Sequence, residues 1–171
     1  MLLTLIRPEA GHKDKAIDFR QEFFDSGEKV INGSELFDNI ESYDEWLEKV
    51  TANTDPTTVD PSWVVTDTFF AADEAGRIVG IIDLRHTLND FLKDFGNCGY
   101  SVRPTERRKG YATEMLRLLL SEAKNAGMSE LHLSVERSNK PSVKTIVKNG
   151  GEYERSFEFE GETADIYRIK I

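Results

Sequence analysis

Hydrophobic and polar residues change their spacing along the chain, and each spacing predicts one kind of secondary structure. Apolar residues three or four positions apart are typical of a helix with one buried face. They predict helices over residues 13–28, 42–50, 113–126 and 141–148. Alternating or continuous apolar runs predict strands. These runs lie at residues 1–8, 66–72, 77–86, 97–102, 131–135, 152–159 and 163–169.

Turn and capping residues separate these elements. Ser42 precedes the second helix and can accept a hydrogen bond from a free amide of its first turn. Residues 51–62 form a turn-rich loop, and residues 73–76 and 160–162 turn the chain between strands, giving two hairpins. The order of the elements predicts an α+β fold. We expect a mixed, mostly antiparallel twisted sheet of about six or seven strands, with helices on both faces.

Length and composition limit what the protein can be. With 171 residues and no linker or repeat, the chain fits one domain, residues 1–171, that can bury a substantial core. The one cysteine, Cys98, excludes an internal disulfide and favours a reducing, cytoplasmic setting. No apolar run approaches the roughly 20 residues of a membrane helix, so no membrane contact is expected.

Charge and residue spacing argue against three further classes. The net charge of −9 repels phosphates over long range, so we do not expect nucleic acid as a partner. Three scattered histidines and one cysteine show no metal-ligand spacing, so no metal is expected. Lys109-Gly110 lacks the Gly-x-x-x-x-Gly-Lys-Ser/Thr arrangement, which argues against a P-loop nucleotide enzyme.

A basic glycine turn, Arg107-Arg108-Lys109-Gly110-Tyr111-Ala112, stands between a predicted strand and a predicted helix. The free amides of a helix's first turn carry partial positive charge and attract anions. Glycine lets the backbone approach such a ligand closely, and Ala112 leaves room beside it. The turn therefore suits a diphosphate, although an exposed basic turn before an amphipathic helix is the simpler interpretation of these residues alone.

Two motifs together resemble those of the GNAT superfamily of acyl-CoA-dependent N-acyltransferases, over nearly the full chain. The acyl-CoA signature of that family is Arg or Gln, two residues, Gly, one residue, then Gly or Ala, and residues 107–112 fit it. The second motif begins with Asn, and Asn139-Lys140-Pro141-Ser142, followed by Lys148-Asn149-Gly150-Gly151, is similar. The strand at 97–102 is similar to the one that precedes the signature.

The resemblance implies splayed central strands with the pantetheine arm of acetyl-CoA between them, bordered by Val102 and residues 134–136. It implies a diphosphate on the amides of residues 108–113. Asn139 would contact the pantetheine or simply cap its helix, and Lys148 would contact the ribose phosphate or only solvent. The expected cofactor-binding residues are Val102, Arg107, Arg108, Lys109, Gly110, Tyr111, Ala112, Thr113, Asn139 and Ser142. Three parts are implied: a variable segment at 10–62, an acyl-CoA core at 63–151 and a hairpin at 152–171.

The implied activity is transfer of an acetyl group from acetyl-CoA to a primary amine of a small molecule or peptide, by direct attack in a ternary complex. Many family members place a tyrosine on the second-motif helix as the acid for the leaving thiolate, and Ile146 stands there. A catalytically weak acyl-CoA sensor or scaffold is therefore the alternative. His86 and Glu136 are candidate catalytic bases, each with a structural or substrate-orienting role as the simpler interpretation.

The acceptor pocket of this family is formed by the variable N-terminal part and the final hairpin. Acidic residues crowd the N-terminal part, which predicts a cationic acceptor. They are Glu22, Asp25, Glu35, Asp38 and Glu41. The final hairpin could also supply an edge for a homodimer.

Overall fold

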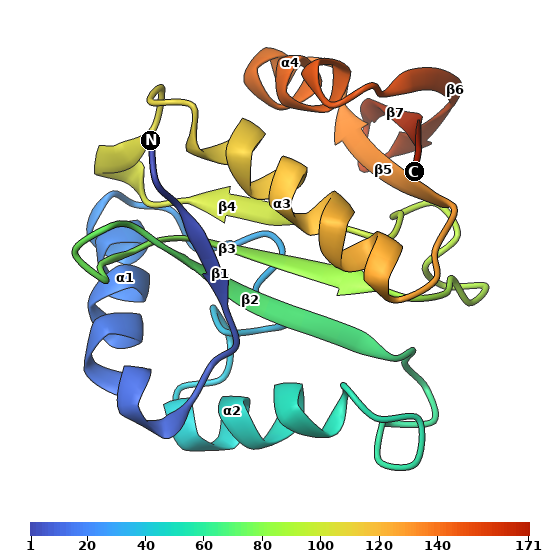
Figure 1. Ribbon diagram of the computed structural model, residues 1–171. Coiled ribbons are helices and arrows are strands. Elements are labelled where there is room, and N and C mark those ends of the chain that lie inside the picture. Colours follow the sequence, from blue (N-terminus) through green and yellow to red (C-terminus); the bar gives the residue numbers. More distant parts are fainter.

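Four helices and seven strands follow the predicted order in a computed structural model that describes residues 1–171 (Figure 1). The helices are α1 (Lys13–Asp25), α2 (Tyr43–Ala52), α3 (Tyr111–Asn125) and α4 (Lys140–Lys148). The strands are β1 (Thr4–Ile6), β2 (Thr66–Ala72), β3 (Ile78–Arg85), β4 (Tyr100–Val102), β5 (Glu130–Glu136), β6 (Glu152–Phe159) and β7 (Glu162–Lys170). Every predicted element is present, with its ends within three residues of the prediction.

The strands form two antiparallel sheets that meet at one point. One sheet has the order β1-β2-β3-β4, and the other has the order β5-β7-β6. A single bridge between Gly96 and Leu133 joins them, and β4 and β5 share no ladder beyond it. The predicted α+β fold with splayed central strands is therefore confirmed, and the splay divides the seven strands into a group of four and a group of three.

Helices α1 and α2 cover one face of the four-stranded sheet (Figure 1). Their aromatic residues pack on the sheet, as the spacing in the sequence predicts. Trp46 is fully buried, and its Nε1 donates to the Ser34 carbonyl over 2.8 Å. Ser42 caps α2 by accepting a hydrogen bond from the Glu45 amide (3.3 Å). This core anchors the loop between α1 and α2, because Ser34 lies in that loop.

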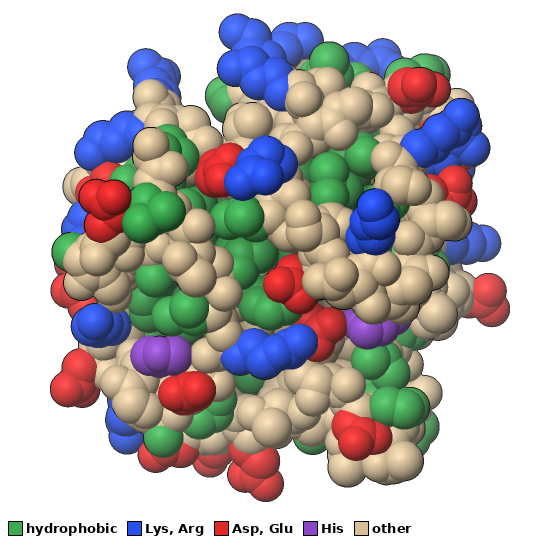
Figure 2. All heavy atoms as spheres, viewed as in Figure 1, with side chains coloured by type: hydrophobic (Ala, Val, Ile, Leu, Met, Phe, Trp, Pro, Cys, Tyr) green, Lys and Arg blue, Asp and Glu red, His purple; other side chains and the backbone are tan.

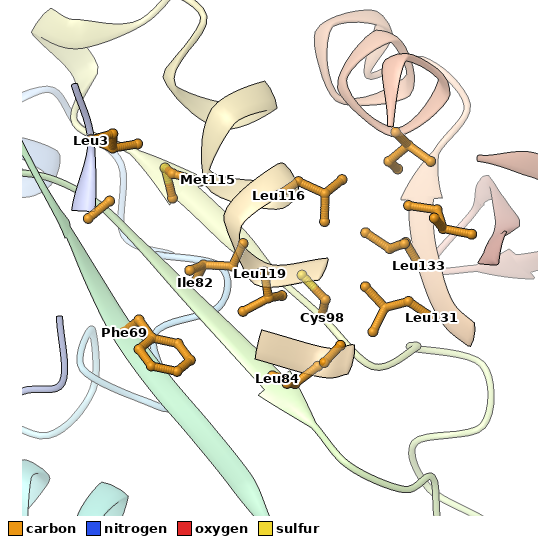
Figure 3. Close-up of a cluster of buried hydrophobic side chains, with 14 of the residues drawn as sticks. Leu3, Phe69, Ile82, Leu84, Cys98, Met115, Leu116, Leu119, Leu131 and Leu133 are labelled. Atoms are coloured by element: carbon orange, nitrogen blue, oxygen red, sulfur yellow. The ribbon is translucent and has the colours of Figure 1, made fainter. Parts of the chain in front are cut away.

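Helix α3 covers the other face and packs against both sheets. Figure 3 shows Met115, Leu116 and Leu119 pointing from α3 toward Ile82 of β3 and toward Leu131 and Leu133 of β5. Burying one aliphatic side chain of this size contributes about 1.5–3 kcal/mol. The apolar face of α3 therefore holds the two sheets together where backbone bonds between β4 and β5 are missing.

Strand β4 is shorter than the strand predicted at 97–102. The amide of Gly99 donates to the side chain of Asp83 (2.6 Å), so the regular ladder begins only at Tyr100. Cys98 is buried in the α3 core, as predicted for a packed thiol, and burial raises its pKa well above the ordinary value. None of the helices combines the length and the apolar composition needed to span a membrane.

Candidate functional site

The turn before α3 has a backbone shape that leaves its amides free. Arg108 (φ 63°) and Gly110 (φ 85°) both lie in the left-handed region. The amides of residues 108–113 donate to no acceptor in the protein, and the helical bonds begin at Glu114, whose amide donates to the Gly110 carbonyl (3.2 Å). Successive free amides at a helix N-terminus form a binding place for a phosphate group. The residues present fit the diphosphate of acetyl-CoA at the predicted position.

The three cations of this turn differ in their surroundings. Arg107 makes two hydrogen bonds to the Glu28 carboxylate, each 2.9 Å, and Lys109 pairs with Glu106 (2.8 Å). Arg108 makes no ion pair and is exposed. Figure 2 shows Lys and Arg side chains gathered over α4 and over the turn before α3. Arg108 is therefore the cation that can turn toward an anion without first breaking an ion pair.

The free edge of β4 faces the gap between the sheets. Backbone bonds at Gly99 and Arg103 connect this segment to β3. Because backbone groups alternate in direction along a strand, the N–H and C=O of Tyr100 and Val102 point away from β3, toward β5. The Val102 carbonyl accepts a hydrogen bond from Arg107 Nε (3.2 Å), which leaves the two amides and the Tyr100 carbonyl available. Val102 therefore lies beside the gap, and its contact with acetyl-CoA stays a prediction.

Strand β5 supplies the opposite side of the gap. At the closed end, the Asn97 amide donates to the His132 carbonyl (2.7 Å), and the Asn97 side chain accepts from the His132 amide (2.9 Å). By the same alternation, the backbone of Ser134 faces β4 where the strands have separated. Two strand edges with free polar groups therefore lie on either side of the gap, as the resemblance implies for a pantetheine arm.

Tyr100 reaches from β4 to α4 across this gap. Its hydroxyl lies 2.6 Å from Ser142 Oγ, and burial raises the pKa of the phenol. Ile146, at the position where the resemblance implies a tyrosine in many members, is buried, with 1% of its surface exposed. The phenol hydroxyl beside α4 therefore belongs to Tyr100 of strand β4 and not to a residue of the helix. The sequence did not indicate Tyr100, because the second motif marks a position on α4 and not on the opposite strand.

Asn139 and Ser142 lie together at the start of α4. The side chain of Asn139 accepts a hydrogen bond from the Ser142 amide (3.3 Å), so Asn139 caps α4, the simpler of the two predicted roles. Asn149, at the other end of α4, donates to the Thr113 carbonyl (3.2 Å) and so ties α4 to the first turn of α3. The two motifs are therefore neighbours in space. Their individual contacts with acetyl-CoA stay predictions.

His86 lies away from these residues. Its Nε2 is 2.7 Å from an oxygen of Asp67, whose other oxygen accepts a hydrogen bond from Arg7 (2.7 Å). His86 lines a groove with residues 126–130, beyond the last turn of α3, whereas the free amides precede the first turn. A helix of this length is about 22 Å long. The role of His86 as a base stays a prediction, and the Asp67 contact gives it a structural role.

Glu136, the last residue of β5, is exposed, and its side chain makes no hydrogen bond or ion pair within the protein. Its carbonyl accepts a hydrogen bond from the Asn139 amide (2.9 Å), so the backbone turns directly from β5 into the cap of α4. The carboxylate is free to act through solvent. Its catalytic role also stays a prediction.

Most of the acidic side chains of the N-terminal part already accept hydrogen bonds from other groups of the protein. Glu22 accepts from Arg103 and from Thr105, Asp25 from Gln21, and Asp38 from the Ile31 amide. Glu35 differs, because its side chain is 7% exposed and one of its oxygens has no hydrogen-bond partner. Of the five acids that predicted a cationic acceptor, the carboxyl groups without a hydrogen-bond donor in the protein are therefore those of the buried Glu35 and the exposed Glu41.

Glu35 lies in a buried polar cluster on the face that α1 and α2 cover. Asp83, fully buried on β3, lies within hydrogen-bonding reach of it, and Arg85 approaches both acids, at 3.3 Å from Asp83 and 3.9 Å from Glu35. Burial, and then the neighbouring Asp83, raise the pKa of Glu35 to about 9. The sequence holds one signal of this site, an aspartate inside the apolar run Ile81-Ile82-Asp83-Leu84.

The profile of the acetyltransferase (GNAT) domain matches residues 5–152 of the chain. The protein belongs to the GNAT acetyltransferase family. It is therefore an N-acetyltransferase that depends on acetyl-CoA, and it acts on an amine acceptor. A search of curated proteins by sequence found no match.

Solved structures show the same GNAT fold. RimL, a ribosomal L7/L12 alpha-N-protein acetyltransferase in complex with coenzyme A, has a TM-score of 0.71 at 12% identity, with 99% of this chain and 94% of that chain covered. YncA from Salmonella typhimurium, with its cofactor acetyl-CoA, has a TM-score of 0.68 at 14% identity, with 98% and 93% covered. A chimera of the spermidine N-acetyltransferase SpeG from Vibrio cholerae and hSSAT has a TM-score of 0.66 at 18% identity, with 99% and 96% covered.

Proposed function

We propose that this GNAT enzyme transfers the acetyl group of acetyl-CoA to a primary amine of a small molecule or peptide, by direct attack in a ternary complex. The observation that carries the proposal is the row of free amides at residues 108–113, beside the gap between β4 and β5. Residues 63–151 would bind acetyl-CoA, and residues 10–62 with the hairpin at 152–171 would surround the acceptor.

Different groups of the turn before α3 and of strands β4 and β5 would bind different parts of acetyl-CoA. The amides of residues 108–113 and the side chain of Arg108 would hold the diphosphate, because donors and positive charge meet there. The free backbone groups of Tyr100, Val102 and Ser134 would pair with the amides of the pantetheine. When bound, acetyl-CoA supplies an acetyl group that is activated as a thioester. Holding an amine beside it can lower the barrier by up to roughly 7–11 kcal/mol in favourable cases.

Tyr100 is the group that we propose as the acid for the leaving thiolate. Its hydroxyl is held by Ser142 at the edge of the gap, and its raised pKa keeps the proton on the phenol at neutral pH. Replacing Tyr100 by phenylalanine should lower kcat by about 100-fold, a typical size for lost acid catalysis, while the Kd of coenzyme A stays unchanged. A wild-type kcat in that variant would refute the role.

Isothermal titration with coenzyme A tests the diphosphate site. Arg108→Glu should weaken binding by at least about tenfold, because a charge-assisted hydrogen bond is worth roughly 1.5–3 kcal/mol. Lys124→Glu, near the exposed C-terminal end of α3, is the matched control and should leave the Kd unchanged. Equal affinities for the two variants would contradict the site, and no binding by the wild-type protein would contradict the function.

Ile146 supports one alternative, an acyl-CoA sensor or scaffold with weak turnover, since the usual acid is missing from α4. A coenzyme A release assay across monoamines, polyamines, aminoglycosides, amino acids and peptide N-termini separates the two functions. Release above the hydrolysis background with any amine supports the enzyme. Tight binding of acetyl-CoA with no such release supports the sensor.

A further inference from the structure

Positive charge is concentrated on helix α4 and on the residues that flank it. Residues 137–151 contain four of the 22 lysine and arginine residues of the chain and none of its 31 aspartate and glutamate residues. The other residues carry the remaining 18 cations together with all 31 acids. A local region of one charge, in a protein of the opposite net charge, attracts and orients a partner of complementary charge.

Three lysines form a stripe along the exposed side of α4. Lys140, Lys144 and Lys148 are four residues apart, so they are neighbours on the helix surface. All three are exposed, and none of them makes an ion pair or a hydrogen bond within the protein. Arg117 on α3 and Arg137 before α4, by contrast, each pair with an acid, at 2.6 and 2.8 Å. The stripe therefore has no bonded counter-charge in the protein.

An exposed apolar side chain lies within this stripe. Val147 is 51% exposed and is a surface neighbour of Lys144 and Lys148. The core side of the helix is provided by Thr145 and Ile146, which are buried. Protein interfaces combine apolar contacts with charged residues around them. We call Lys140, Lys144, Val147 and Lys148 the α4 patch.

The α4 patch runs beside the gap between β4 and β5. Near the N-terminal end of α4, Ser142 Oγ lies 2.6 Å from the hydroxyl of Tyr100 on β4. At the other end, the side chain of Asn149 donates to the Thr113 carbonyl in the first turn of α3 (3.2 Å). Figure 2 shows Lys and Arg side chains both over α4 and over the turn before α3. The patch therefore extends from the proposed diphosphate site to the proposed acid, Tyr100.

The α4 patch is longer than the phosphates of coenzyme A require. Lys148 directly precedes Asn149 and so lies at the end of α4 that contacts the first turn of α3. Lys140 is eight residues earlier, about 12 Å along the helix axis, at the end where the uncharged pantetheine would lie. Phosphates at the turn before α3 therefore leave Lys140 and Lys144 without a partner. A broader anionic surface, such as that of a protein, covers the whole stripe.

Charge and position together indicate which partner fits. A long polyanion such as nucleic acid would extend past the patch, over a surface where acids outnumber cations by 31 to 18, and would be repelled there. A small acidic domain can contact the patch alone. The gap beside the patch offers free amides and strand edges that fit a phosphate followed by a pantetheine arm. A carrier protein combines an acidic surface with such an arm.

We propose that the α4 patch is the docking surface for an acidic carrier protein, and that the acyl-phosphopantetheine arm of this carrier enters the gap as a second acyl donor. The inference rests on the proposed function, because the arm uses the same amides and strand edges as acetyl-CoA. The phosphate of the arm binds the amides of residues 108–113. The carrier domain then lies outside the turn, in place of the adenosine part of acetyl-CoA.

The transfer step balances in the same way for both donors. The lone pair of a neutral amine forms the C–N bond with the thioester carbon, and the C–S bond breaks with its electron pair on the pantetheine sulfur. The nitrogen gives one proton to solvent. The phenol of Tyr100 gives one proton to the sulfur and regains one from solvent. The products are an amide and a carrier with a free thiol.

Binding of a carrier protein tests the docking surface without turnover. In fluorescence anisotropy with labelled bacterial acyl carrier protein, the holo form, which has phosphopantetheine, should bind at least about tenfold more tightly than the apo form, because two linked contacts act together. Coenzyme A should displace the holo form, since both need the gap. Raising NaCl from about 50 to about 300 mM should weaken binding severalfold, because salt screens the charges. Equal binding of the two forms, or no displacement, would overturn the proposal.

Charge reversal tests the residues of the patch. The double variant Lys140→Glu/Lys144→Glu should weaken binding of the holo-carrier at least about tenfold, because attraction becomes repulsion, and should keep the Kd of coenzyme A within about twofold of wild type. Lys124→Glu/Lys170→Glu makes the same change of charge on exposed residues at the C-terminal ends of α3 and β7. This matched control should bind the carrier as the wild type does. Equal weakening by the two double variants would refute the docking surface.

Steady-state kinetics with three donors provide the last test, with the amine that gives the highest release of coenzyme A. The acetyl-carrier should have a kcat/KM at least about tenfold above that of acetyl-phosphopantetheine, which has the same arm without the domain. Lys140→Glu/Lys144→Glu should lose this advantage and keep the wild-type kcat/KM with acetyl-CoA. An acetyl-carrier that is no better than the fragment would overturn this inference alone. Absence of transfer from all three donors would instead contradict the proposed function.

Discussion

Replacing Glu35 by glutamine should stabilise the protein at neutral pH. Glu35 has an ordinary pKa of 4.5 and a folded-state pKa of about 9. At pH values between these two pKa values, Glu35 is ionised in the unfolded chain but still protonated in the folded protein. The free energy of unfolding therefore falls as pH rises through this range. At pH 7 the pH lies 2.5 units above the ordinary pKa, and each unit is worth about 1.36 kcal/mol. Glutamine does not ionise, and it removes a destabilisation of at most about 3 kcal/mol.

Thermal melts at two pH values measure this effect. For a protein of this size, 1 kcal/mol shifts Tm by about 2–4 °C, so Glu35→Gln should raise Tm by up to about 6–12 °C at pH 7. At about pH 3.5 and below the difference should nearly disappear, since Glu35 is then largely protonated in both states. Glu48→Gln, which is exposed, should show no such pH dependence. An equal shift for Glu35→Gln at both pH values would refute the reasoning.

Three further substitutions test the fold around the site. Ser42→Ala removes the cap of α2 and should cost about 1 kcal/mol in a urea titration; an unchanged midpoint would show that the cap contributes nothing. Arg103→Ala loses a buried side chain whose Nε donates to the Ile78 carbonyl over 2.8 Å and whose Nη1 contacts Asp18 and Glu22, and we expect a loss of about 3 kcal/mol. Gly33→Ala should cost more than Gly27→Ala by about 1–3 kcal/mol, because both have positive φ but only a methyl group at Gly33 would meet the Gly99 carbonyl. Equal losses at the two glycines would contradict a close approach of the α1–α2 loop to β4.

The sequence was sufficient to predict the order of elements and the position of the basic glycine turn before α3. Helical spacing predicts α3 and α4, and the turn at residues 107–112 is a local motif whose conformation depends mainly on neighbouring residues. Local chemistry of this kind can be inferred from a single sequence. The free amides at 108–113 lie where that motif predicts them.

The long-range contacts of Glu35 and of Tyr100 could not be predicted in the same way. Glu35 and Asp83 are far apart in the chain, and only the docking of the α1–α2 loop on β4 brings them together. Tyr100 similarly meets Ser142 only because β4 and α4 lie on either side of the gap. Such pairs depend on tertiary packing, and no periodic pattern in the sequence records them. Arg107 was expected at the diphosphate, and the structure pairs it with Glu28 of the segment after α1.

The open gap between β4 and β5 has a consequence for how the protein behaves when it is stored or heated. Unpaired strand edges are places where foreign strands add and aggregation begins. On β4, Arg107 covers the Val102 carbonyl and the side chain of Tyr100 reaches Ser142 of α4, so this edge is partly covered. If acetyl-CoA binds in this gap, as proposed, it covers the remaining free backbone groups, and the bound protein should aggregate more slowly on storage or heating than the free protein.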